Sequence, residues 1–138
     1  MNNDPLDKIF AKPEEIDNKR KKILADILNS FARMDVENGT FLPTIIWEGL
    51  GSKEKILVFM VARLALSTRN QLFTSCVSPK DIENNTEIPG GTVRPKIKEL
   101  YEDKLVTKND TGGYCIKSSL ITLLKIKSFL EITETRIE

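Results

Sequence analysis

The feature of this sequence that most constrains its fold is the apolar run ILVFMVARLAL, which extends from Ile56 to Leu66. Ten of its eleven residues are apolar, and Arg63 is the exception. The run is too short to span a bilayer, because a membrane helix needs about 20 apolar residues. A helix that is apolar nearly all round must be covered on several sides by other elements. We therefore predict a central core helix over residues 53–69 and no membrane partner for the chain.

Start and stop signals predict two further long helices, one on each side of the core helix. Pro13 is followed by two acidic residues, and both features favour a helix N-terminus. The stretch ENGT at 37–40 is typical of a helix end. We therefore predict an amphipathic helix over 13–36. The last predicted helix covers 119–132 and carries apolar residues on several of its faces.

Two shorter helices, separated by a tight turn, are predicted in the middle of the chain. Ser78 can cap a helix over 79–87, because proline follows it and an aspartate stands three residues after it. The turn IPGG comes next, and its glycines permit the backbone angles of a sharp turn. Thr92 then caps a helix over 92–104. Pro95 would lie in the first turn of that helix, where its missing N–H breaks no helical hydrogen bond.

A β-hairpin is predicted around the stretch NDTGG, which lies between the strand-like pieces LVTK and YCIK. The apolar and β-branched segment 72–77 is expected to pair with it, so that a small sheet joins 72–77, 105–109 and 113–117. The fold class is then mainly α with a small β element (α+β). We predict one domain over 13–138, preceded by a disordered or frayed N-terminus over 1–12.

The absence of histidine narrows the chemistry open to this chain. Its 138 residues include no His, which removes the commonest general base, the commonest metal ligand and every Ser-His or Cys-His nucleophile. The two cysteines, Cys76 and Cys115, lie far apart and make no metal-ligand spacing. There is also no glycine-rich phosphate loop. We therefore predict a protein that is not an enzyme and that uses no catalytic residue, metal or cofactor.

Cysteine use and the N-terminus suggest where the chain resides. Two separated cysteines are simply explained as small buried hydrophobic residues in a reduced, intracellular setting. The N-terminal stretch MNNDPLDKIF lacks the basic and apolar regions of a signal peptide. We therefore predict a cytoplasmic location.

Positive charge is concentrated in one place, although the net charge of the chain is only +1. Residues 92–98 carry Arg94, Lys96 and Lys98 and no acid, whereas residues 99–103 carry three acids. A basic helix start suits phosphate, and arginine can read the edge of a guanine through two hydrogen bonds. The start of this helix is thus the strongest candidate binding surface in the sequence.

The order of the predicted elements resembles the winged helix-turn-helix domain. The stretch SPKDIENNTEIPGGTVRPKIKELYEDKLV resembles the helix-turn-helix of MarR-like and ArsR-like transcription regulators, and the hairpin VTKNDTGGYCIK stands where the wing would be. The match covers about residues 52–117, with extra N- and C-terminal helices outside it. The resemblance implies a DNA-binding transcription regulator, with helix 92–104 in the major groove and the wing over 105–117.

The same resemblance implies which residues would contact DNA. Arg94 would read a base edge, Pro95 would offer an apolar surface, and the lysines would contact phosphates. The full set is Lys80, Thr92, Arg94, Pro95, Lys96, Lys98, Lys108 and Asn109. The strand before the motif usually pairs with the last wing strand, which would make Cys76 and Cys115 neighbours.

Alternatives remain open for the partners of the chain. The first expected partner is double-stranded DNA, and the alternative is a winged-helix protein–protein interaction module within a larger complex. Glu99, Glu102 and the small net charge favour that alternative. We also predict a homodimer through the first and last helices, because the last helix has more apolar faces than one core can cover. The alternative to a homodimer is that the first and last helices cover each other and the core helix within one chain.

Overall fold

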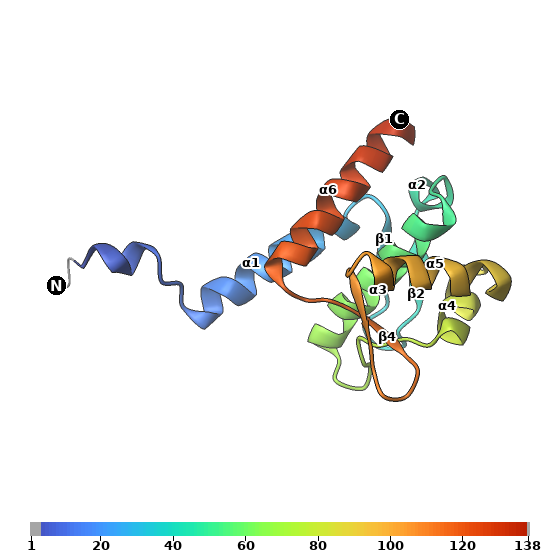
Figure 1. Ribbon diagram of the computed structural model, residues 1–138, viewed down its shortest axis with the longest axis horizontal. Helices are drawn as coiled ribbons and strands as arrows, with labels where there is room; N and C mark the ends of the chain where they lie inside the picture. The colour runs from blue at the N-terminus through green and yellow to red at the C-terminus, as the bar shows by residue number, and fades with distance from the viewer. Residues whose placement is uncertain (1–3, 138) are drawn as a thin grey trace.

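The protein is described by a computed structural model that covers residues 4–137, with side chains described for residues 4–132. Its centre is helix α3 (Ser52–Arg69), which the other elements surround (Figure 1). Every side chain from Ile56 to Ala62 is completely buried, which confirms the predicted core helix. Three helices pack against it, namely α1 (Pro13–Leu28), α4 (Pro79–Thr86) and α5 (Gly90–Glu102).

Arg63, the one cation in the apolar run, lies at the edge of the core. Its Nε donates a hydrogen bond to the carbonyl of Thr74 over 3.0 Å, and its guanidinium lies 5.2 Å from the ring centre of Phe73. The charge therefore stays partly solvated while its aliphatic stem follows the helix surface. This arrangement is how a single arginine is tolerated inside an otherwise apolar helix.

Helix α6 (Leu120–Ile137) lies beside α1, and the two helices run together across one side of the molecule (Figure 1). Leu123, Ile126 and Leu130 of α6 are fully buried in the core. Polar contacts also join the pair, because Lys127 lies 3.5 Å from the Asp26 carboxylate. The predicted last helix is thus confirmed, with a later end than expected. The expectation that these two helices cover each other is correct for one face of each.

The predicted end of the first helix is wrong. Helix α1 ends at Leu28, and residues 29–36 do not continue it. Instead strand β1 (Ala32–Met34) pairs antiparallel with strand β2 (Phe41–Pro43). Gly39 has φ +72° and turns the chain between them. The physical reason is burial: Phe31, Ala32 and Phe41 enter the core only as a hairpin, which overrides the helix propensity of the ARM sequence.

The segment after this hairpin carries a short helix that the sequence analysis did not predict, α2 (Ile45–Glu48). Thr44 caps it, and its hydroxyl accepts a hydrogen bond from the Trp47 amide. The Trp47 ring is 3 % exposed, and its Nε1 donates to the carbonyl of Lys55 over 3.2 Å. Near the N-terminus, the 3-10 helix η1 (Pro5–Lys8) buries none of its residues.

Helices α4 and α5 stand almost where they were predicted, but the turn between them is different. Ser78 and Asp81 form the expected capping box at the start of α4. The positive φ of +62° falls on Glu87, so neither glycine makes the sharp turn. The amides of Thr92 and Val93 both donate to the carbonyl of Pro89, so α5 begins at Gly90.

This earlier start of α5 corrects two predictions. Thr92 is not the cap of the helix but lies within its first turn. Pro95 lies in the helix interior, so the carbonyl of Gly91 receives no helical hydrogen bond from residue 95. The prediction that Pro95 breaks no hydrogen bond is therefore wrong. The helix tolerates it because Val93, Ile97 and Leu100 are buried against the core.

The predicted hairpin is confirmed as strands β3 (Val106–Lys108) and β4 (Tyr114–Ile116). Segment 72–77 is not a third strand, because only Val77 pairs with this hairpin. The Val77 amide donates to the Tyr114 carbonyl over 2.8 Å, and the Tyr114 amide donates back over 2.7 Å. The Asn70 side chain holds the loop that follows α3, because its Nδ2 donates to the Val36 carbonyl and its Oδ1 accepts from the Leu72 amide.

Cys76 and Cys115 are neighbours, as the resemblance implied, and they form a disulfide with Cα atoms 4.2 Å apart. The prediction of two small buried thiols is wrong, since both residues are half-buried and covalently joined. The Val77–Tyr114 pairing explains their approach, because it aligns the residues on either side of it. The bond ties the segment leading into α4 to strand β4.

Within residues 4–137, no helix is long and apolar enough to cross a membrane. The elements of this described part of the chain are mainly helices, with two small antiparallel strand pairs. This composition agrees with the predicted α+β fold class.

Candidate functional site

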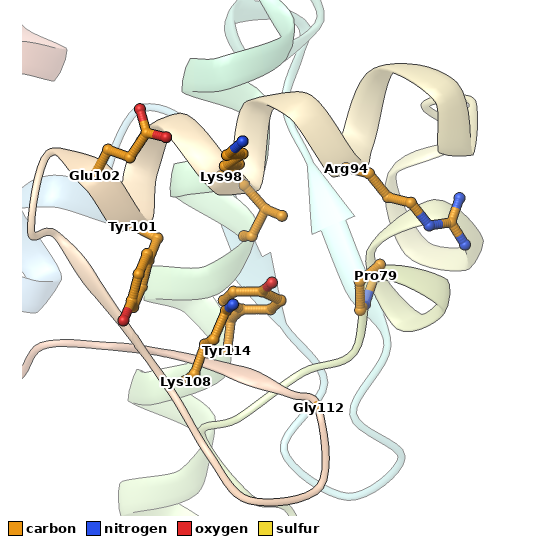
Figure 2. A pocket seen from close by; sticks show the side chains of 9 residues that line it. Pro79, Arg94, Lys98, Tyr101, Glu102, Lys108, Gly112 and Tyr114 are labelled. Atoms are coloured by element: carbon orange, nitrogen blue, oxygen red, sulfur yellow. The ribbon is translucent and has the colours of Figure 1, made fainter.

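A cavity lined by several of the predicted binding residues lies between helix α5 and the β3–β4 hairpin (Figure 2). We call it the α5–hairpin groove. Its volume is about 460 Å³, within the range of ligand-binding pockets. Its lining residues come from α4, α5 and the hairpin, and they are Pro79, Arg94, Ile97, Lys98, Tyr101, Glu102, Lys108, Gly112 and Tyr114.

One flank of α5 supplies the upper wall of the groove. Arg94, Lys98 and Tyr101 stand at spacings of four and three residues, so they share that flank. The neighbouring face of the helix buries Val93 and Leu100 in the core, and this burial sets the rotation of α5. The apolar face of the helix therefore directs the basic and aromatic residues toward the hairpin.

The hairpin supplies the lower wall, where Lys108 faces two tyrosine rings. Lys108 and Tyr114 are opposite each other in the antiparallel register. The Lys108 ammonium lies 5.0 Å from the ring centre of Tyr101 and 5.8 Å from that of Tyr114. Figure 2 shows Lys108 and Tyr114 together below α5, with Tyr101 descending from the helix beside them. The groove thus combines aromatic surface with positive charge.

Neither tyrosine is among the eight residues predicted from the sequence to bind DNA. A signal was present, because Tyr101 follows Lys98 by three residues and Tyr114 stands across the predicted hairpin from Lys108. Recognising it required the strand register, which sets which hairpin residues share a face. The structure therefore adds Tyr101 and Tyr114 to the candidate site.

Arg94 reaches the far end of the groove and approaches an acid there. Its Nη2 lies 3.9 Å from Oε2 of Glu83, with the Arg94 side chain 64 % exposed and that of Glu83 20 % exposed. A Cβ atom on Gly90 would lie 2.7 Å from both Arg94 Nη1 and Glu83 Oε1, so glycine leaves room for this approach. An exposed pair at this distance is weak, and Arg94 can leave it for another anion.

The outward face of α5 is less basic than its sequence suggested. Lys96 lies on the flank away from the groove, where its ammonium is 3.2 Å from the Glu99 carboxylate. Pro95, Glu99 and Glu102 are exposed. The remaining positive charge of the helix therefore lies on its groove side. There Arg94 and Lys98 of α5 and Lys108 of the hairpin line the groove together with one acid, Glu102.

The remaining predicted residues lie outside the groove lining. Lys80 is exposed in the first turn of α4, and Thr92 is half-buried in the first turn of α5. Asn109 shapes the hairpin loop, because its Oδ1 accepts hydrogen bonds from the amides of Thr111 and Gly113. Of the eight predicted site residues, the structure thus brings Arg94, Lys98 and Lys108 together in one cavity.

Metal binding has no candidate in the part of the chain that is described. Among the side chains described, those of residues 4–132, no group of three or more His, Cys, Asp or Glu is arranged to hold a metal ion. The groove offers ammonium, guanidinium and phenol groups, which suit an anion or an aromatic ligand.

No protein-family model matches this sequence, and neither a curated protein nor a solved structure matches it.

Proposed function

We propose that this protein is a DNA-binding transcription regulator of the winged helix-turn-helix type. The observation that carries the proposal is that Lys98, Lys108 and Arg94 all line the α5–hairpin groove, with Arg94 at its α4 end. These cations come from a helix and a hairpin that are adjacent in space, as a recognition helix and a wing would be. In this proposal α5 enters the major groove and the β3–β4 hairpin follows the backbone of double-stranded DNA.

The proposed roles follow the positions of the side chains. Arg94 reads a base edge, because its exposed guanidinium can exchange the 3.9 Å approach to Glu83 for two hydrogen bonds to a guanine. Lys98 and Lys108 bind phosphates. Lys96, by contrast, must first leave Glu99, so its contribution is smaller.

Salt-dependent binding measurements test this proposal. Arg94→Ala should cost ~1–3 kcal/mol and relax the preference at one base position. Lys98→Ala should weaken binding to all sequences alike and reduce the salt slope by about 1. Lys19→Ala is the matched control, because Lys19 is an exposed lysine on α1 outside the groove. The proposal is wrong if the protein binds no genomic DNA fragment even at low salt.

A protein–protein interaction module is the second candidate function. It is favoured by the acids Glu99 and Glu102, which are exposed on the outward side of α5. Phosphates would repel these acids, whereas a basic protein surface would attract them. Glu99→Lys separates the two functions, since it should strengthen non-specific DNA binding if α5 meets DNA and leave it unchanged otherwise.

A homodimer is also proposed, with α6 as its main surface. Ile121, Leu124 and Ile132 are 69 %, 49 % and 57 % exposed on the side of α6 that does not face the core. These positions lie on one side of the helix, with Lys125 and Ser128 between them, and a second copy could cover this side. Light scattering at roughly tens of micromolar should give twice the monomer mass. Ile121→Glu should reduce that mass, whereas Leu42→Glu, at an exposed apolar position on β2, should not.

The cytoplasm is the proposed location, because a transcription regulator acts on DNA there. The Cys76–Cys115 disulfide is the observation against this location, since cellular thiols keep cytoplasmic cysteines reduced. Alkylation of Cys76 and Cys115 in freshly lysed cells, followed by mass spectrometry, therefore tests the location. Modification of both thiols supports a cytoplasmic protein, and protection of both contradicts it.

A further inference from the structure

We infer that the α5–hairpin groove holds an unpaired nucleotide, with its base against the tyrosine rings and its phosphate against the lysines. This inference rests on the proposed DNA binding and makes it more specific, because it names the DNA structure that the site prefers. Continuous duplex keeps every base inside its stack, so it cannot fill an aromatic groove. DNA with a single-stranded tail or junction can do so.

The walls of the groove have the chemistry of a stacking platform. Tyr101 is 44 % exposed and Tyr114 is half-buried, so both rings contribute surface to the cavity. Ile97 and Pro79 add apolar lining, and Gly112 leaves the loop side open. Proteins that bind single strands combine aromatic faces with a positively charged path for the backbone. Lys98 and Lys108 supply that path on opposite walls.

Lys108 occupies the place that a base would take. Its ammonium lies 5.0 Å from the Tyr101 ring centre and 5.8 Å from the Tyr114 ring centre. An exposed cation–π contact of this kind is worth about a two- to fivefold factor. Stacking of a base on an aromatic ring is worth about five- to 160-fold. A base therefore displaces the ammonium, which remains within the groove to bind the adjoining phosphate.

The charges around α5 favour this mode over insertion of a duplex alone. Glu99 and Glu102 are exposed, and the two backbones of a duplex groove would run beside them. The cations Arg94, Lys98 and Lys108 instead line a cavity between α5 and the hairpin. A single strand that enters this cavity meets three cations and one acid, Glu102, and leaves Glu99 outside.

Equilibrium binding to three DNA probes of related sequence tests the inference. The probes are a blunt duplex, the same duplex with a tail of several unpaired thymidines, and the tail strand alone. The tailed duplex should bind about five- to 160-fold more tightly than the blunt one. A double Tyr101→Leu and Tyr114→Leu variant should lose this difference. The corresponding double phenylalanine variant should keep it, because phenylalanine retains the ring and lacks only the hydroxyl.

Phe10→Leu is the matched control, since Phe10 is an exposed aromatic residue in the N-terminal segment, outside the groove. It should keep the full difference between the probes. A second measurement does not depend on any variant: 5-iododeoxyuridine in the unpaired tail should crosslink to Tyr101 or Tyr114 on irradiation.

The outcomes separate this inference from the proposed function. Equal affinity for blunt and tailed duplexes, or a preference that survives in the double leucine variant, would overturn the inference and leave duplex DNA binding intact. A crosslink that maps only outside the groove would also overturn it. Failure to bind any of the three probes at low salt would overturn both the inference and the proposed function.

Discussion

Removal of the Cys76–Cys115 disulfide should destabilise the protein by about 4 kcal/mol. The bond joins residues 39 positions apart, and closing a loop of that length in the unfolded chain reduces its entropy by an amount that corresponds to about 4 kcal/mol at 25 °C. The unfolding entropy of a chain of 138 residues converts this to a fall in melting temperature of about 14 °C. Little packing is lost with the sulfurs, because both cysteines are half-buried.

Circular dichroism melts of the oxidised protein, the dithiothreitol-reduced protein and a double Cys76→Ala and Cys115→Ala variant measure this effect. The reduced protein and the variant should melt at similar temperatures, both below the oxidised protein. Added reductant should not change the melt of the double variant, which serves as the control for reductant effects. The reasoning is refuted if the oxidised and reduced proteins, with thiol content verified by alkylation, unfold at the same temperature.

Three further predictions concern stability. Lys104→Gly should stabilise the protein by ~0.5–1 kcal/mol in urea denaturation, because Lys104 ends α5 with φ +64°, a conformation that costs a lysine more than a glycine; unchanged or lower stability would contradict this. Phe59→Ala should cost ~3–5 kcal/mol in the same assay, since the ring is fully buried and lies 5.2 Å from the Phe41 ring; a cost below that of a surface substitution would show that α3 is not the core. The hydrogen bond from the Asn38 side chain is the main cause that lowers the pKa of Asp35 below 3.8. The stabilisation from Asp35 is therefore present above its unfolded pKa and is lost as pH falls through its lower folded pKa. Asp35→Asn should remove this part of the acid-induced loss of stability, as acid titrations of the urea midpoint would show.

The helical part of the fold was largely predictable because its signals are local. Ser78 and Asp81 form a capping box whose residues are three positions apart, and the structure contains it. The apolar run around Ile56 identified the core helix, because no other arrangement covers a helix that is apolar all round. The β3–β4 hairpin followed from a glycine-containing loop between two β-prone pieces.

Two predictions about helix boundaries, the end of α1 and the start of α5, are wrong because packing and hydrogen bonds in the folded chain determine these boundaries. The stretch ENGT at 37–40 is typical of a helix end, but its Asn-Gly pair is also a hairpin signal. The burial of Phe31 and Phe41 in one core decides for the hairpin. The start of α5 moved to Gly90 because the Pro89 carbonyl accepts hydrogen bonds from the amides of Thr92 and Val93. Both cases are examples of tertiary packing that overrides local propensity.

The candidate site also has one part that the sequence predicts and one part that depends on tertiary packing. The sequence located its cations, since Arg94 and Lys98 stand one helical turn apart on a helix whose apolar face is recognisable. It did not locate the aromatic side of the groove, because Tyr101 and Tyr114 meet Lys108 only when α5 packs over a hairpin in a specific register.

By itself the sequence determined where most helices form, which helix is central and where positive charge concentrates, because spacing and capping are properties of neighbouring residues. Only the tertiary structure decided which flank of α5 faces the hairpin, that Cys76 reaches Cys115, and that one face of α6 stays exposed. Those outcomes depend on the packing of residues far apart in the chain, since a close-packed core allows each helix only one rotation about its axis.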